Sequence, residues 1–323
     1  MRLQKTPVHE LAESLGLTVL TPQRARDPEF IEQIRVLAPD LIVLASYGKI
    51  LPQSLLEIAP LGNWNLHASL LPKYRGASPI QYAILNGETE TGVTLMEMVR
   101  EMDAGDVYLQ VREPILPDDD YGSLEARLAQ RAADLLMEGL ERLQSGTLTR
   151  TPQNHAEATY APLITKEDCR IRWEEPAERC RNRIRAFSPK PGAYTFWRGK
   201  LLKIWKAEVV DDSALTPNPS PTAWERGVNS PLAHAVGDGG TGGEGATASL
   251  PWERGVNSPL AHAVGEGGRG GEGEILSTDP DHFLVACGVG ALRLLEVQPE
   301  SRPRMDIRAF VNGYRPQMGE RLE

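Results

Sequence analysis

The sequence is poor in cysteine and contains no long apolar run. Its three cysteines, Cys169, Cys180 and Cys287, are odd in number and lack the CxxC spacing, which argues against a disulfide framework and against a zinc ribbon. No run of about eighteen apolar residues is present, and the first residues lack the apolar segment of a secretory signal. We therefore expect a cytoplasmic protein with buried thiols, without bound metal and without a membrane-spanning helix.

The first half of the 323-residue chain alternates patterns typical of helices and of buried strands. Amphipathic segments that begin with a capping residue and a proline alternate with short apolar runs. This alternation predicts a Rossmann-like α/β domain with a mostly parallel sheet over residues 1–150. The expected helices run from Thr6 to Gly16, from Asp27 to Leu37, from Ser78 to Gly87 and from Ser123 to Gln144, and the expected strands are Leu17–Leu20, Leu41–Ser46, a strand ending near Asn65, and the segments GVTLMEM and VYLQV.

The second half of the chain has a different character. After a linker at 151–165, a short helix around 177–187 precedes strand patterns in YTFW, LLKIWKAEV, HFLVACG and ALRLLEVQ, which predict a small OB-like β-barrel over 166–323. Trp197 and Trp205 are expected in its core. A segment at 216–272, rich in glycine, proline and serine, contains WERGVNSPLAHAVG twice, and we expect it to be a disordered insertion in the barrel.

Three side chains next to expected strand ends carry the candidate chemistry. Asn65 and His67 flank one residue, so both point to the same side where an apolar strand leaves the sheet, and Asp103 lies in a turn after another strand. An amide, an imidazole and a carboxylate suit acyl transfer to an amine, because they supply an oxyanion donor, a proton carrier and an anion that orients the ring. From these residues alone, a purely structural role stays open for each of them.

The segment around these residues resembles a known family. NLHASLLPKYRGASPIQYAILNGETETG, which begins at Asn65, is similar to the signature of the 10-formyltetrahydrofolate-dependent formyltransferases. The resemblance implies a formyltransferase fold, 10-formyltetrahydrofolate as the formyl donor, and Asn65, His67 and Asp103 as the catalytic residues. It also implies that the folate contacts a loop formed by Ser69, Leu70, Leu71 and Pro72.

The C-terminal half narrows the expected formyl acceptor. APLITKEDCRIRW, IRAFSPKPGAY and VNGYRPQMGERL resemble the C-terminal domain of those family members that formylate methionyl initiator tRNA. The resemblance implies formyl transfer to that tRNA for translation initiation, by a chain that we expect to be monomeric. The alternatives are another member of the family, such as a hydrolase of the donor or a formyltransferase of an amino-sugar nucleotide, and an inactive remnant that only binds tRNA.

A local concentration of positive charge agrees with an RNA substrate. The chain carries a net charge of −9, yet nine cations and no acid lie between Arg179 and Ala207. Phosphate contacts by such cations would make RNA binding depend steeply on salt. A solvated helix and strand edge is the alternative interpretation. The candidate tRNA contacts are Arg181, Arg185, Lys190, Lys200, Lys203 and Lys206.

The beginning of the sequence departs from the family pattern. Members of the family have a strand, a helix and a second strand before the segment that is similar to MRLQKTP, and the resemblance implies that these elements are absent from this sequence. We therefore expect an N-terminally truncated formyltransferase fold. Apolar surface should be exposed in it, because the first strand lies centrally in a sheet that is covered on both faces.

Overall fold

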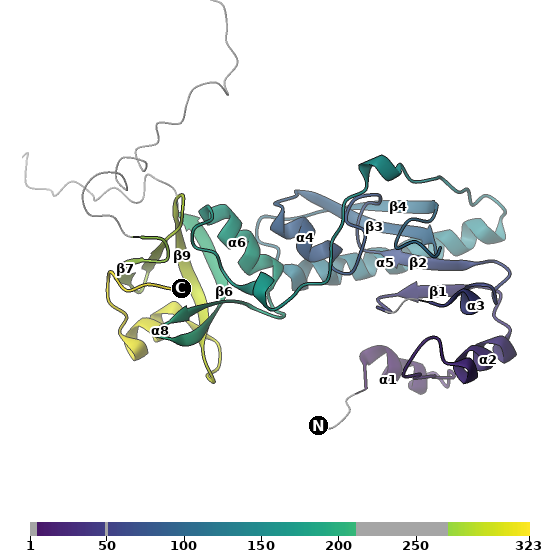
Figure 1. Ribbon diagram of the computed structural model, residues 1–323, viewed down its shortest axis with the longest axis horizontal. Coiled ribbons are helices and arrows are strands. Elements are labelled where there is room, and N and C mark those ends of the chain that lie inside the picture. The colour runs from purple at the N-terminus through teal and green to yellow at the C-terminus, as the bar shows by residue number, and fades with distance from the viewer. Residues whose placement is uncertain (1–4, 49–50, 211–270) are drawn as a thin grey trace, which may run out of the picture. The chain divides into compact units, whose positions relative to one another are not determined.

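A computed structural model describes residues 5–48, 51–210 and 271–323, which form two compact units (Figure 1). The first unit contains residues 1–171 and 182–194, and the second contains 172–181 and 195–323. This division differs from the expected domains, because residues 151–171 and 182–194 belong to the first unit. The expected insertion lies outside the described residues up to position 270. Its last two residues, Gly271 and Glu272, belong instead to a turn in which the backbone N–H of Glu274 donates to the carbonyl of Gly271.

The first unit is built on a mixed sheet. Its strands lie in the order β1 (Ile42–Ala45), β2 (Asn63–His67), β3 (Glu90–Glu97) and β4 (Val107–Pro114). β1 and β2 are parallel, whereas the β2–β3 and β3–β4 pairs are antiparallel. The α/β class is confirmed, but the described sheet is not mostly parallel. One reason is that β3 and β4 are joined by residues 98–106, and a parallel crossover needs about a dozen residues or more.

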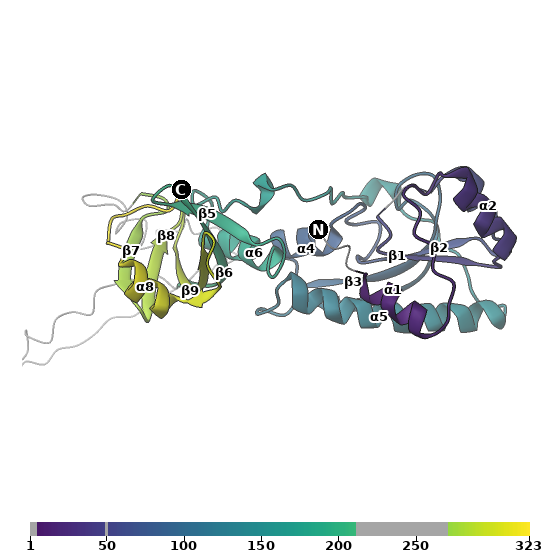
Figure 2. The same cartoon turned by 90° about the horizontal axis from the view of Figure 1, so that it is seen from below.

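Two helices pack on the part of the sheet that carries the candidate residues. α5 (Tyr121–Gln144) runs along β3 and β4 (Figure 2), and α4 (Pro79–Leu85) contacts β3 and α5. α5 approaches the sheet closely at Gly139, where an added Cβ would lie 2.4 Å from the Leu95 side chain. Its N-terminus is closed by a capping box between Asp120 and Ser123. No helix in the described part of the chain is apolar over a length sufficient to cross a membrane.

The helices before the sheet begin where the sequence predicts but bury little. The N–H of His9 donates to the Thr6 hydroxyl at the start of α1 (Pro7–Ser14), and α2 (Pro28–Leu37) follows. A short helix that the sequence patterns did not predict, α3 (Gln53–Leu56), lies between β1 and β2. The apolar face expected to be buried is open, since Val8 is 77% exposed. The strand expected at Leu17–Leu20 is wrong, because these residues pair with no strand among the described residues. β1 is only partly buried, because it lies at the edge of the described sheet and pairs with β2 alone.

The second unit is a small barrel. Its strand order is β5 (Ala193–Trp197), β6 (Lys200–Val210), β9 (Ala291–Pro299), β8 (His282–Ala286) and β7 (Ile275–Asp279), with β10 (Met305–Asp306) also on β9. The last residues close the ring, because Glu323 exchanges backbone hydrogen bonds with Phe196, and Ile275 donates to Glu320. α8 (Ile307–Tyr314), which the sequence patterns did not predict, packs against β9 and β10. Trp197 and Trp205 are core residues as predicted, each 7% exposed.

Candidate active site

β2 supports the first two candidate residues. It lies between β1 and β3, with Asn65 opposite Leu44 and Met96, and His67 opposite Thr94. Residues two apart on a strand share a face of the sheet, so both side chains leave β2 on the same side. The Asn65 side chain is half-buried, and its amide makes no hydrogen bond with any residue that the structure describes. Its N–H groups are therefore available to a ligand.

The His67 ring is fixed through one nitrogen and faces a carboxylate with the other. Nε2 lies 2.8 Å from the backbone carbonyl of Tyr74. A carbonyl only accepts hydrogen bonds, so Nε2 carries a proton. Nδ1 lies 3.7 Å from Oδ2 of Asp103, and the two side chains are only 6% and 13% exposed. Nδ1 is consequently the ring nitrogen that can accept or release a proton at this site.

Tyr74 is held firmly enough to serve as the anchor of the imidazole. Its hydroxyl donates to Glu88 at 2.7 Å and accepts from Asn86 at 3.1 Å. Burial raises the pKa of Tyr74 to about 12. The hydroxyl therefore stays protonated near neutral pH, which keeps its bond to the carboxylate intact.

Asp103 lies in a strained turn that several hydrogen bonds stabilise. Its φ of 50° falls in the left-handed region, which costs a residue with a side chain about 1 kcal/mol or more. The backbone N–H of Gly76 donates to Oδ2 at 2.8 Å. Nε2 of Gln153 donates to the carbonyls of Asp103 at 2.8 Å and Gly105 at 2.7 Å. The carboxylate and its backbone are thus fixed from two directions.

A buried arginine holds Gln153. Arg75 is 2% exposed, and its guanidinium donates to Oε1 of Gln153 at 2.7 and 3.2 Å and to Nδ1 of His155 at 3.1 Å. No acid pairs with it among the described residues. The network runs from Arg75 through Gln153 to the backbone of Asp103. The sequence did not indicate the roles of Arg75 and Gln153. Nothing in the local pattern around either residue shows that its side chain is buried and bonded rather than exposed to solvent.

The segment expected to be a linker, 151–165, forms part of the site. It runs alongside the loop after β2: Arg75 donates to the carbonyl of Thr159 at 2.8 Å, and Ala161 donates to the carbonyl of Arg75 at 2.7 Å. Gly76 permits this contact, since its φ is 116° and an added Cβ would lie 2.7 Å from the Ala161 carbonyl. This segment therefore holds the loop that carries Tyr74 and Gly76.

The four expected folate contacts form a loop that is tied to the sheet. Ser69 is fully buried, and its hydroxyl donates to the carbonyl of Lys73 at 2.6 Å. The Thr94 hydroxyl of β3 donates to the carbonyl of Ser69 at 2.7 Å and accepts from the N–H of Leu71 at 3.2 Å. Leu70 and Pro72 are half-buried. The side chains of Leu70 and Pro72 can therefore touch a ligand, while those of Ser69 and Leu71 serve the loop itself.

The expected tRNA contacts fall on both units. Arg185 and Lys190 belong to the first unit, and Arg181, Lys200, Lys203 and Lys206 belong to the second. The guanidinium of Arg185 is engaged within the first unit, because it donates to the backbone carbonyls of Asp119 at 2.6 Å and Leu116 at 2.9 Å. These bonds close a turn of the first unit. Lys200 and Lys206 are exposed and have no acidic partner among the described residues.

The described residues hold no group of three or more His, Cys, Asp or Glu side chains suited to a metal ion. The site contains a half-buried amide, a buried imidazole and a carboxylate, with an apolar loop beside them. This set suits acyl transfer, since it offers hydrogen-bond donors for an oxyanion and a nitrogen that exchanges a proton.

Comparison with known proteins gives the same reaction class. Residues 1–140 match the family model described as "Formyl transferase", and residues 163–229 and 256–315 match "Formyl transferase, C-terminal domain". A methionyl-tRNA formyltransferase of Caldanaerobacter subterraneus is 39% identical over 315 residues, which are 97% of this chain and 84% of that protein. Its counterpart in Symbiobacterium thermophilum is 41% identical over 321 residues, covering 99% of this chain and 82% of that protein.

Solved structures share the fold at lower identity. HypX from Aquifex aeolicus, one structure of which is in complex with tetrahydrofolic acid, superposes with TM-scores of 0.58 and 0.56 at 19% and 20% identity. The match covers 94% of this chain but 43% of the HypX chain. A sugar N-formyltransferase from a Shewanella species gives 0.52 at 24% identity over 62% of this chain and 81% of its own. On the family models and the relatives together, the chain belongs to the formyl transferase family.

Proposed function

We propose that the chain is a methionyl-tRNA formyltransferase, which transfers the formyl group of 10-formyltetrahydrofolate to the amino group of methionyl initiator tRNA. The observation that carries this proposal is that Asn65 and His67 share a face of β2, and that Nδ1 of His67 faces Asp103. The Asn65 amide makes no hydrogen bond with the described residues and so can bind the substrate. The acceptor is supported by relatives with that name, which match the chain through both of its domains. We further propose that it acts in the cytoplasm.

The reaction proceeds by addition and elimination at the formyl carbon. The neutral amine of the methionyl group attacks this carbon, a C–N bond forms, and the carbonyl oxygen becomes an oxyanion that the Asn65 amide and the protonated Nδ1 of His67 stabilise. Asp103 orients the imidazole and helps to move the proton. The bond from the formyl carbon to the folate nitrogen then breaks, and that nitrogen takes up the proton which the amine has lost.

The donor is a substrate and leaves as tetrahydrofolate. Its formyl group, with the folate nitrogen that carries it, must reach the side of β2 that Asn65 and His67 share. Leu70 and Pro72 follow β2 directly and offer half-buried apolar surface for the flat ring system. In this mechanism, side chains of the trio carry out both proton transfer and oxyanion stabilisation, so no step is assigned to a metal ion.

Formyl transfer to charged initiator tRNA tests the proposal directly. The purified chain is incubated with 10-formyltetrahydrofolate and methionyl initiator tRNA, and formylmethionine is measured after hydrolysis of the ester. Asp103→Asn should lower kcat by about 10² or more, because it removes the charge that orients the imidazole. Its amide oxygen can still accept from Gly76, so the fold should be retained. Glu32→Gln, at an exposed ion pair with Arg35, is the matched control and should leave kcat unchanged.

Parallel reactions separate this acceptor from the others. Amino-sugar nucleotides and water take the place of the charged tRNA in otherwise identical mixtures. Formyl transfer to an amino sugar, or release of formate alone, in the absence of transfer to tRNA would refute the proposed acceptor while leaving the trio in place. If Asp103→Asn retained wild-type kcat, the assignment of the trio itself would be wrong.

A further inference from the structure

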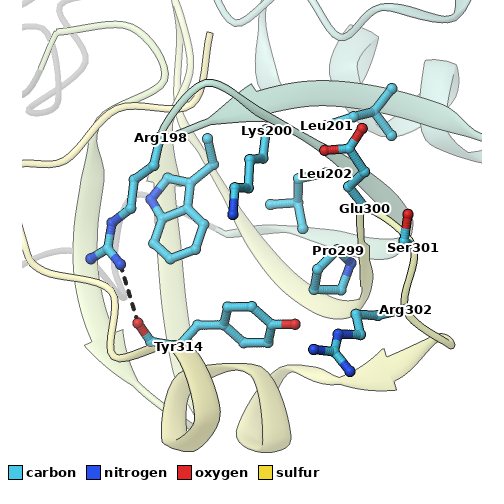
Figure 3. A pocket seen from close by; sticks show the side chains of 10 residues that line it. Arg198, Lys200, Leu201, Leu202, Pro299, Glu300, Ser301, Arg302 and Tyr314 are labelled. Carbon is cyan, nitrogen blue, oxygen red and sulfur yellow. Dashed lines mark hydrogen bonds between the residues drawn. The ribbon is translucent and has the colours of Figure 1, made fainter.

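A pocket in the barrel unit has no role in the chemistry described above. It has a volume of about 430 Å³ and opens between the turn from β5 to β6, the turn after β9 and the end of α8 (Figure 3). This volume is within the range of pockets that hold small ligands. Leu202 and Pro299, both buried, give the pocket an apolar wall, and the ring of Tyr314 lies across from Lys200.

Two cations at the rim have no acidic partner among the residues that the structure describes. Lys200 points into the pocket, and Arg302 lies near the hydroxyl of Tyr314 (Figure 3). Neither side chain is paired with an acid among the described residues, and both are exposed. The third cation, Arg198, differs because it pairs with Glu320 at 2.7 Å and stacks on Trp197 at 4.1 Å. Arg198 thus serves the barrel, whereas Lys200 and Arg302 are available to an anion.

The elements that carry these groups are rigid. Arg198 and Gly199, with φ of 50° and 69°, form the tight turn before Lys200. Two hydrogen bonds close the turn that carries Arg302. The backbone N–H of Arg302 donates to the carbonyl of Pro299 at 3.1 Å, and the side-chain amide of Gln298 donates to the carbonyl of Arg302 at 2.7 Å. The backbone of the pocket is consequently held in place by the protein itself, so binding a ligand need order only the side chains of Lys200 and Arg302.

We propose that this pocket binds one unstacked nucleotide of the RNA substrate. The base lies against the ring of Tyr314 and Pro299, and a phosphate lies between Lys200 and Arg302. A base offers a flat apolar face, and the phosphate joined to it supplies the charge that both cations require. Glu300 at the rim accepts hydrogen bonds from a ribose hydroxyl or an exocyclic amino group. The proposal rests on the proposed function, which supplies the RNA.

Binding of charged initiator tRNA to the full chain tests the pocket. Lys200→Gln and Arg302→Gln each remove one charge-assisted contact and should raise the Kd for this tRNA about tenfold at moderate salt. Arg308→Gln is the matched control. It removes one exposed cation of the same unit that is paired with Asp281 away from the pocket, and it should change the Kd less than about twofold.

Crosslinking locates the nucleotide independently of the substitutions. Initiator tRNA that contains 4-thiouridine is irradiated with the wild-type chain, and crosslinked peptides are identified by mass spectrometry. Peptides containing Tyr314 or residues 299–302 are expected. If crosslinks avoid both segments, or if Lys200→Gln and Arg302→Gln behave like Arg308→Gln, the pocket does not bind a nucleotide.

The formyl transfer assay distinguishes this outcome from a failure of the proposed function. At saturating tRNA, the pocket variants should keep the wild-type kcat and raise only the KM for tRNA. A wild-type chain that binds tRNA through the pocket but transfers no formyl group would refute the proposed function alone. A wild-type chain that transfers the formyl group, with pocket variants that match the control, would refute the pocket alone.

Discussion

At the residue scale, the geometry of the site depends on the backbone of Asp103. Its left-handed conformation turns the carboxylate toward Nδ1 of His67, and this conformation is unfavourable for a residue with a side chain. The contacts that compensate come from Gly76 and Gln153, which lie far from Asp103 in the sequence. Gln153 touches neither the imidazole nor the carboxylate, so we regard it as a positioning residue.

Replacing Gln153 should weaken catalysis through Asp103. Gln153→Leu removes the donor to the carbonyls of Asp103 and Gly105 and leaves the buried guanidinium of Arg75 with its bond to His155, which should destabilise the fold by about 2 kcal/mol. A displaced carboxylate should lower kcat by about 10² with an unchanged Kd for tRNA. The pH dependence of kcat should also shift, because it reports the groups that exchange protons in the bound complex.

Gln130→Leu is the control for this prediction. Gln130 lies exposed on α5, where its amide donates to Asp134 at 3.0 Å. The control should retain both stability and kcat. A Gln153→Leu enzyme that loses stability but keeps the wild-type pH profile and kcat would show that Gln153 has only a structural role.

The three thiols should be inert in the folded chain. Cys169, Cys180 and Cys287 are buried, as the sequence predicts. A hydrogen bond with Cys180 and burial raise the pKa of the Cys287 thiol, so the reactive thiolate is scarce below that pKa. We expect no reaction with Ellman's reagent at pH 8 under native conditions, and three equivalents in urea. Ser14→Cys provides an exposed thiol as a positive control, and rapid native labelling of the wild type would contradict the expectation.

At the scale of elements, α5 is joined to β4 by a charged cluster at one end of the sheet. Glu113 of β4 is 4% exposed and accepts from Arg131 at 2.8 Å and from Arg127 at 2.9 Å. Arg127 also bridges to Asp119 at 2.6 Å. The hydrogen bond from Arg131, together with that from Arg127, holds the pKa of Glu113 below its usual range. The cluster therefore fixes α5 to β4, whose Gln110 donates to the carbonyl of Leu71 in the loop after β2 at 2.9 Å.

Glu113→Gln should lower the stability of the first unit in a pH-dependent way. Loss of the buried charge should cost about 2 kcal/mol at pH 7. Because the pKa of Glu113 is depressed in the folded state, its contribution is present above the unfolded pKa and is lost as pH falls through the folded one. The difference in urea midpoint between wild type and variant should thus shrink below about pH 4. Glu90→Gln, which removes an exposed pair with Arg112, should change stability by under about 0.5 kcal/mol at any pH.

At the scale of the whole molecule, the first unit exposes apolar side chains on neighbouring elements. Val8 and Leu11 of α1 are 77% and 60% exposed, and Val36 of α2 is 76% exposed. β1 pairs only with β2 among the described residues, and its Val43 is 38% exposed. A strand edge beside exposed apolar helices favours association with another chain. The expectation of a monomer can therefore be tested at this surface.

Val43→Lys should reduce self-association of the chain. A charge on β1 makes edge-to-edge pairing unfavourable, so light scattering and sedimentation should show a smaller concentration dependence of the mass than for the wild type. Met137→Lys, which adds the same charge on an exposed position of α5, controls for the change in net charge. A wild-type chain that stays monomeric at high concentration would contradict the predicted self-association and would agree with the monomer expected from the sequence.

Patterns that depend on near neighbours in the sequence were predicted well. Thr6 and Asp27 mark helix starts, GVTLMEM and VYLQV are strands, and the two tryptophans lie in the barrel core. The strand at Leu17–Leu20 was wrong, because an apolar run becomes a strand only where a partner strand supplies its hydrogen bonds. The contacts of Arg185 and of the segment 151–165 could not be predicted for a related reason. Their partners, such as Asp119 for Arg185 and Arg75 for Thr159, lie far away in the sequence.

By itself, the sequence identified the family: the segment that begins at Asn65 resembles the formyltransferase signature, and this resemblance implies the candidate trio. Only the tertiary structure decided which atoms meet, since Nε2 of His67 bonds to a backbone carbonyl and Nδ1 faces Asp103. The same holds for Gln153, Arg75 and the pocket at Tyr314. Local patterns record what a side chain is, whereas hydrogen bonds between distant segments decide what it meets, and these exist only once the chain is folded.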